Sequence, residues 1–357
     1  MFIKKNIAWT SALLTFATAP VLAGAKLDLG DGKSAEIGGS VRAEISSVDG
    51  GAPDGESNSM NFNIHSARIY LKATLSDFLS FNVQTEKDGE KGVALIDAAA
   101  KFKLGKSVQI WAGRFIPPSD RANLSGSYNL PVWDYPGKVS MYPNIKAGRD
   151  DGIAIIGTPL SGKLVYALGV FEGVTGETNP SDNPIVSGRL AYSFWDAEGY
   201  LTRSTYYGKK DVLTIAYTFA NQPESLASTS GDTDFVAQNV DFLLEKNLGS
   251  AGVGTLEAAL YNYNKNGGLD SSRQGEASMV SASYLLPAQI GVGKVQLTYR
   301  YQQFEPENSA FDSSTRSDVG ITYVIDGHNT RVGFYLGNDE TGSVKTDFIK
   351  VGLQVKI

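Results

Sequence analysis

Basic side chains on alternate positions of otherwise apolar segments are the clearest candidates for chemistry in this chain. Those that we single out are Arg42, Arg68, Lys72 and Arg300. Because successive side chains of a β-strand point to opposite faces, these residues would share the face opposite the apolar one. Lys and Arg around a pore favour anions, and an arginine can hold the oxygens of an oxyanion in a bidentate fork. The pattern predicts a wall that attracts small anions; cross-strand pairing with acidic residues is an equally good interpretation of each single residue.

Residues 117–150 form the second candidate feature, because they are too many for an ordinary connection. The basic residues at its start and along it are Arg114, Arg121, Lys138, Lys146 and Arg149. Aromatic residues such as Trp133 could pack this segment against an inner wall, and Pro117–Pro118 would stiffen its base because each ring fixes φ. We expect the segment to fold inward and carry selectivity; the alternative is an external loop.

Signals for catalysis are poor. His65 and His328 are the only two histidines, and they show no metal-ligand spacing. The chain has no cysteine, which excludes disulfides, thiolate metal sites and covalently attached c-type haem. There is no G-x-S-x-G motif, and GSAGVGT at 249–255 lacks the Lys-Ser/Thr ending of a phosphate-binding loop. We therefore predict a protein that is not an enzyme and that carries no cofactor or metal.

The elements that must position these residues are amphipathic strands. At the end of the chain, for example, apolar residues occupy every second position from Ile349 to Ile357. Many of these segments are about 9–13 residues long, which suits tilted membrane strands and exceeds the ~5–6 residues of soluble ones. The segments that we assign to strands are 34–46, 62–75, 79–86, 93–104, 107–116, 151–158, 163–172, 184–195, 211–220, 234–245, 253–263, 276–286, 293–304, 316–325, 330–337 and 346–357.

These sixteen segments predict an all-β fold, an antiparallel transmembrane β-barrel, since no strand edge can face hydrocarbon. Residues 199–207 are the weakest assignment and are taken as part of a long turn. Lys4 and Lys5, followed by a short apolar stretch and Ala23–Gly24–Ala25, predict a signal peptide over 1–23 and one barrel domain over 24–357. Short turns alternate with longer loops, which is typical of the bacterial outer membrane. The net charge of -6 gives no general attraction to nucleic acid.

Two stretches resemble the phosphate-selective porin family, the O and P porins. They are FNIHSARIYLKATLSDFLSFNVQTE at 62–86 and AGRFIPPSDRANLSGSYNLPVWDYPGKVSMYPNIKAGRDDGIAIIG at 112–157. The resemblance implies a sixteen-stranded homotrimeric porin whose long third loop folds into the pore, with basic residues near the constriction. The chain differs from the family at His65–Ser66, where paired arginines are frequent, and at Ile357, where a terminal Phe is common.

Together these observations predict an outer-membrane porin, set in lipid, through which small solutes diffuse passively, with a preference for anions or oxyanions such as phosphate. The alternative is a barrel that sheathes a partner, such as an electron-transfer cytochrome. An outer-membrane hydrolase on a barrel scaffold is a third possibility, but it would need a Ser/His pair on neighbouring strands.

Overall fold

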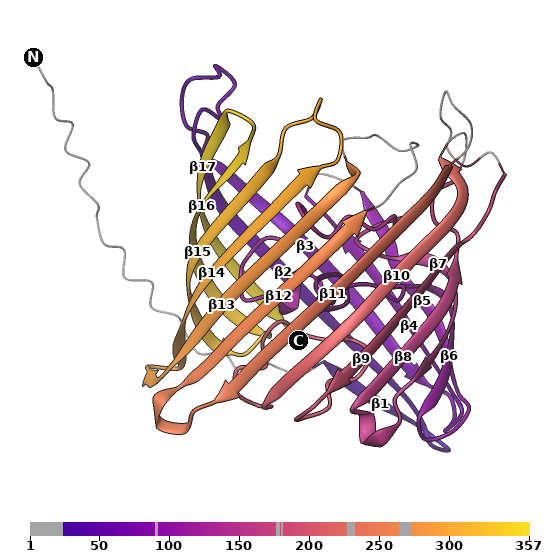
Figure 1. Ribbon diagram of the computed structural model, residues 1–357. Coiled ribbons are helices and arrows are strands. Elements are labelled where there is room, and N and C mark those ends of the chain that lie inside the picture. Colours follow the sequence, from indigo (N-terminus) through magenta and orange to yellow (C-terminus); the bar gives the residue numbers. More distant parts are fainter. Residues whose placement is uncertain (1–23, 90–91, 176–178, 180, 227–232, 264–272) are drawn as a thin grey trace, which may run out of the picture.

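Sixteen antiparallel strands close into a barrel in the computed structural model, which describes residues 24–89, 92–175, 179, 181–226, 233–263 and 273–357 (Figure 1). Each strand pairs with the next along the chain, and the last pairs with the first of the ring, Lys356 lying opposite Ser40. The strands are β2 (Lys33–Val48), β3 (Asn61–Thr74), β4 (Leu79–Lys87), β5 (Val93–Lys103), β6 (Val108–Phe115), β7 (Asp150–Gly157), β8 (Leu164–Phe171), β9 (Ile185–Ser193), β10 (Val212–Leu226), β11 (Thr233–Asn247), β12 (Val253–Tyr263), β13 (Gly275–Ile290), β14 (Gly293–Pro306), β15 (Ser314–Asp326), β16 (Thr330–Thr341) and β17 (Val344–Lys356). The predicted strands and fold class are confirmed.

One further strand, β1 (Ala25–Gly30), was not predicted. It folds back on β2 through a turn at Asp31 and Gly32, both of which have positive φ. Since β17 pairs with β2 only from Ser40 onward, β1 covers the part of the β2 edge that β17 does not reach. The predicted signal peptide, 1–23, lies outside the described residues.

The two faces of the wall follow the alternation in the sequence. Leu297 on β14 is 43% exposed and Ile321 on β15 is 52% exposed, whereas Thr298, the residue after Leu297, is buried. An apolar surface outside and polar side chains inside suit a barrel surrounded by lipid. Within the described part of the chain, no helix is long and apolar enough to span a membrane.

In the described part of the chain, two of the longer connections reach far into the barrel and contact inward-facing side chains. The first, residues 116–149, is called here the inner segment and contains α1 (Arg121–Ser125) and η1 (Ser127–Asn129). The second connects β9 to β10 over 194–211 and has no strand, as expected for a long turn. Among the described residues, two further short helices lie in turns: η2 (Leu160–Gly162) and η4 (Gly249–Ala251).

A buried apolar cluster, rich in aromatic residues, packs the inner segment against strands from β5 to β14. Trp111 packs edge-on against Phe115 and Tyr200, with ring centroids 5.6 and 5.4 Å apart. Leu124 and Val139 of the inner segment belong to the same buried cluster. The two long connections also meet directly, since Ser204 N donates to Asn129 O at 3.2 Å. The apolar side of the inner segment is therefore buried in this packing, and its polar side chains contact the charged residues of the wall.

Candidate functional site

Basic side chains gather on six neighbouring strands, β14 to β17, β2 and β3, and this part of the inner face is called the basic arc. Its basic residues include Arg300, Arg316, Arg331, Lys350, Lys356, Arg42, Arg68 and Lys72. Its acidic residues are fewer: Glu36, Glu44, Asp318 and Asp339. Across the lumen, the inward charges of β9, β11 and β12 are Arg189, Asp241, Glu245 and Glu257. The lumen is therefore basic on one side and mostly acidic on the other.

Trp133 brings the inner segment onto the basic arc. Its indole Nε1 donates to Glu44 Oε2 at 2.6 Å, and its carbonyl accepts a hydrogen bond from Arg42 Nη2 at 2.5 Å. The Arg42 guanidinium carbon lies 3.9 Å from the centroid of the Trp133 ring. Stacking of a cation on an indole face, together with these hydrogen bonds, fixes both side chains.

Asp134 extends the same contact. Its carboxylate accepts hydrogen bonds from Lys350 Nζ, at 2.8 and 3.1 Å, and from Arg316. Its carbonyl accepts from Arg300 Nη1 at 2.7 Å. Burial alone would raise the pKa of the Asp134 carboxyl, but the charges of Lys350 and Arg316 outweigh burial, so that pKa lies below its ordinary value. Asp134 is therefore a fixed negative charge against the basic arc.

On the opposite side, the inner segment meets the acidic wall. Asp120 caps α1 by accepting from Asn123 N at 3.2 Å, and it also accepts from Tyr261 Oη at 2.7 Å. Burial, aided by the charge of Asp241, raises the pKa of Asp120 to about 6. Arg121 forms a bidentate pair with Glu198 of the 194–211 connection, both hydrogen bonds measuring 2.7 Å. The inner segment is thus anchored to both walls by charged groups.

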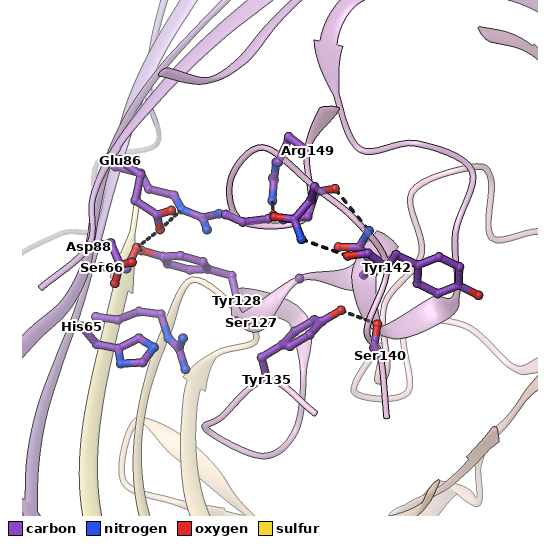
Figure 2. A pocket seen from close by; sticks show the side chains of 17 residues that line it. His65, Ser66, Glu86, Asp88, Ser127, Tyr128, Tyr135, Ser140, Tyr142 and Arg149 are labelled. Atoms are coloured by element: carbon purple, nitrogen blue, oxygen red, sulfur yellow. Dashed lines mark hydrogen bonds and ion pairs between the residues drawn. The ribbon is translucent and has the colours of Figure 1, made fainter. Parts of the chain in front are cut away.

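A cavity of 330 Å³ lies between the basic arc and the inner segment (Figure 2). The two sides approach each other where Ser66 Oγ and Tyr128 Oη are 3.0 Å apart; in Figure 2 Tyr128 lies beside Ser66 and Glu86 of the wall. The cavity's lining includes three arginines: Arg42, Arg68 and Arg149.

The three arginines differ in their partners. Arg68 Nε donates to Glu86 at 2.7 Å, and Arg149 Nε lies 3.4 Å from Asp97 Oδ1. Arg42 is fully buried and forms no ion pair with a carboxylate of the described residues. Its Nε and Nη1 atoms also have no hydrogen-bond partner among these residues. Unpaired N–H donors of a buried guanidinium are costly unless a ligand or water satisfies them. The unpaired donors of Arg42 make it a candidate contact for an anion in the cavity.

Of the predicted site residues, three therefore lie together at the cavity: Arg42, Arg68 and Arg149. Lys72 and Arg300 also lie on the basic arc but away from the cavity: Lys72 Nζ is 3.5 Å from Glu36, and Arg300 pairs with Asp318 at 2.8 Å.

Four predicted residues have other surroundings. Arg121 is buried in its ion pairs, and Lys138 pairs with Asp339 at 2.7 Å. Lys146 is half-buried and forms an isolated bridge with Arg149. Arg114 faces outward and is bidentate to Asp151 at 2.7 and 2.6 Å, because Trp111 and Phe115 take the inward positions of β6.

Sequence reasoning did not single out Arg316. Arg316 could have been predicted, since it lies two positions before Asp318 on β15 and therefore points to the same inward face. The aromatic residues of 117–150, Tyr128 among them, were expected to pack against an inner wall, and Tyr128 Oη lies 3.0 Å from Ser66 Oγ on β3. Among the described residues, no cluster of His, Asp and Glu could hold a metal ion.

Comparison with known proteins gives both a family and a fold. The family model of phosphate-selective porin O and P matches residues 36–234, more than half of the chain. The anion-selective porin from Comamonas acidovorans superimposes with a TM-score of 0.63 at 15% identity, over 91% of this chain and all of that one.

Two other barrels are similarly close in structure. OmpF of Salmonella typhi, in complex with daunomycin, gives a TM-score of 0.61 at 14% identity and covers 93% of this chain and 100% of its own. The trimer form of OmpT from Vibrio cholerae gives 0.58 at 12% identity and covers 92% of this chain and 100% of its own. At such identities the likeness shows the fold. No curated protein matches the chain.

Proposed function

The chain belongs to the phosphate-selective porin O and P family, and we propose that this outer-membrane porin passes small solutes by diffusion with a preference for anions, oxyanions such as phosphate among them. The observation that carries the proposal is the basic arc, with Arg42 unpaired at the cavity beside Arg68 and Arg149. An ordered row of basic side chains replaces part of the hydration that an anion loses in a narrow passage.

The inner segment supplies the narrowing in this proposal. It contacts the basic arc through Trp133 and Asp134 and the opposite wall through Asp120 and Arg121. Charges act more strongly in a confined, partly dehydrated passage than at an open mouth. A solute that passes between the inner segment and the basic arc would therefore experience the arginines at close range.

Homotrimer formation is a further part of the proposal. Its support is the family, together with an apolar groove on the outer face around the seam of β17, β2 and β3, lined by residues such as Val41, Ile69 and Val355. Native mass spectrometry in mild detergent should show three copies. A monomer in several detergents would remove this claim and leave the single barrel intact.

The sheath for a partner protein has less support. Both the inner segment and the 194–211 connection contact inward-facing side chains, such as Glu44 and Glu245. The chain's own residues therefore take up space that a protein inside the barrel would need.

Single-channel conductance in lipid bilayers tests the proposed function. We expect the conductance to fall strongly when chloride is replaced by a larger anion such as acetate, and little when potassium is replaced by lithium. The opposite dependence, or the absence of open channels from correctly folded protein, would contradict the proposal.

A further inference from the structure

We infer that Trp133 is a positioning residue: it fits a notch at Gly352 on β17, holds the inner segment against the basic arc and thereby fixes Arg42 at the cavity. This inference rests on the proposed function, because it explains how the selective wall and its narrowing are kept together. It concerns the placement of groups and assigns no direct contact between Trp133 and a solute.

The notch exists because Gly352 has no side chain. A Cβ atom added there would lie 2.5 to 2.6 Å from three carbon atoms of the Trp133 ring, closer than real Cβ atoms approach their neighbours. The backbone of Gly352 does not need glycine, since its φ lies outside the positive range. The close approach of the indole is therefore what requires glycine at this position.

The notch continues onto the neighbouring strand. Gly352 pairs with Gly333 of β16, so two glycines lie side by side. Tyr335 covers Gly333, and the Tyr335 and Trp133 rings are 6.3 Å apart between centroids. Trp133, at 1% exposed, is consequently enclosed by wall residues although it belongs to a connection between strands.

Trp133 also determines the position of Arg42. The indole stacks on the guanidinium, the Trp133 carbonyl accepts one of its hydrogen bonds, and the indole N–H is directed to Glu44. These contacts leave Arg42 Nε and Nη1 without partners among the described residues. If Trp133 left the notch, Arg42 could turn toward Glu44, and the cavity would lose its unpaired arginine.

Variants on both sides of the contact test this inference. Gly352→Val fills the notch from the wall, Trp133→Ala empties it, and Trp133→Phe keeps a ring while removing the indole N–H. Gly254→Val is the matched control, because a Cβ at Gly254 on β12 meets no heavy atom within 4 Å. Folding of each variant is checked by its heat-dependent gel mobility before channel recording.

We expect Gly352→Val and Trp133→Ala to raise single-channel conductance and to move the chloride-to-potassium permeability ratio toward one. Trp133→Phe should lie between these variants and the wild type, and Gly254→Val should match the wild type. If a Trp133 variant does not fold, the conductance and permeability ratio of Gly352→Val alone test the inference. Wild-type conductance and permeability ratio in folded Gly352→Val would overturn the inference.

The Arg42→Gln variant separates this inference from the proposed function. If Arg42→Gln lowers the permeability ratio but Gly352→Val changes nothing, only the role of Trp133 fails. If Arg42→Gln leaves the ratio unchanged while Gly352→Val raises conductance, Trp133 still holds the inner segment, and the proposed anion selectivity fails together with the positioning of Arg42.

Discussion

Replacing Asp134 by asparagine tests the contact between the inner segment and the basic arc, since it keeps the side-chain shape and removes one charge. The carboxylate lies 2.8 Å from Lys350 Nζ and also pairs with Arg316. Hydrogen bonds to charged groups contribute about 1.5–3 kcal/mol each. Arg316 keeps Asp318 as a partner, and water in the lumen screens the pair, so we expect a loss of about 1–3 kcal/mol in the free energy of unfolding.

The pH dependence follows from the lowered pKa of Asp134. A carboxyl whose pKa is lower in the folded state contributes its stability above the pKa of the unfolded state, about 4, and loses it as the pH falls through the folded value. The wild type should therefore exceed Asp134→Asn in stability at pH 7, and the two should converge in acid.

Urea unfolding in lipid vesicles and reversal potentials in a salt gradient measure the two consequences of Asp134→Asn. Removal of the negative charge leaves Lys350 and Arg316 less compensated, so the reversal potential should shift toward anions. Asp347→Asn is the control, because Asp347 is exposed and lies 3.7 Å from Lys345. Unchanged stability at pH 7, or a shift toward cations, would refute the reasoning.

Other changes test the rest of the structure. Arg121→Gln leaves the buried carboxylate of Glu198 without its arginine, while Asp241 keeps Arg189, and should cost about 3–5 kcal/mol in the free energy of unfolding, measured by urea titration; a loss below that of an exposed arginine would contradict its buried role. The pKa of Asp120 is raised to about 6, so its contribution to stability is present below pH ~4 and lost as the pH rises through 6; Asp120→Asn should abolish this change, on the order of 3 kcal/mol, in a pH series of unfolding curves. Leu297→Arg should cost about 2–4 kcal/mol near the bilayer midplane, whereas Gln84→Arg should cost far less, because Gln84 lies two residues before the inward-facing Glu86 on β4; equal losses in a refolding assay would reverse the assignment of faces.

The barrel could be predicted because lipid and water impose a strict alternation on every strand. Residues such as Leu297 and Thr298 record this alternation locally, so strand positions follow from the sequence alone. The strand β1 is short and joins β2 through a tight turn, so the sequence pattern did not distinguish it from an irregular segment before β2.

The candidate site could be predicted only in part, because it depends on contacts between distant residues. Arg42 and Arg68 follow from inward alternation, but the contact of Trp133 with Gly352 joins residues more than two hundred positions apart. The outward position of Arg114 depends on aromatic packing by Phe115 inside the barrel. The pairing of Arg121 with Glu198 likewise needs two connections to meet, which local patterns do not reveal.

The reversal potential of the channel in a potassium chloride gradient, before and after replacement of Arg42, Arg68 and Arg149 by glutamine, tests the central claim most directly. The reversal potential of the wild type should have the sign expected when chloride is the more permeant ion. The reversal potential of the triple variant should shift toward the value expected when potassium is the more permeant ion. A variant with the same changes at Arg114 and Lys345, which lie away from the cavity, should stay close to the wild type. A cation-preferring wild type, or a folded triple variant with an unchanged potential, would contradict the proposal that these arginines select anions.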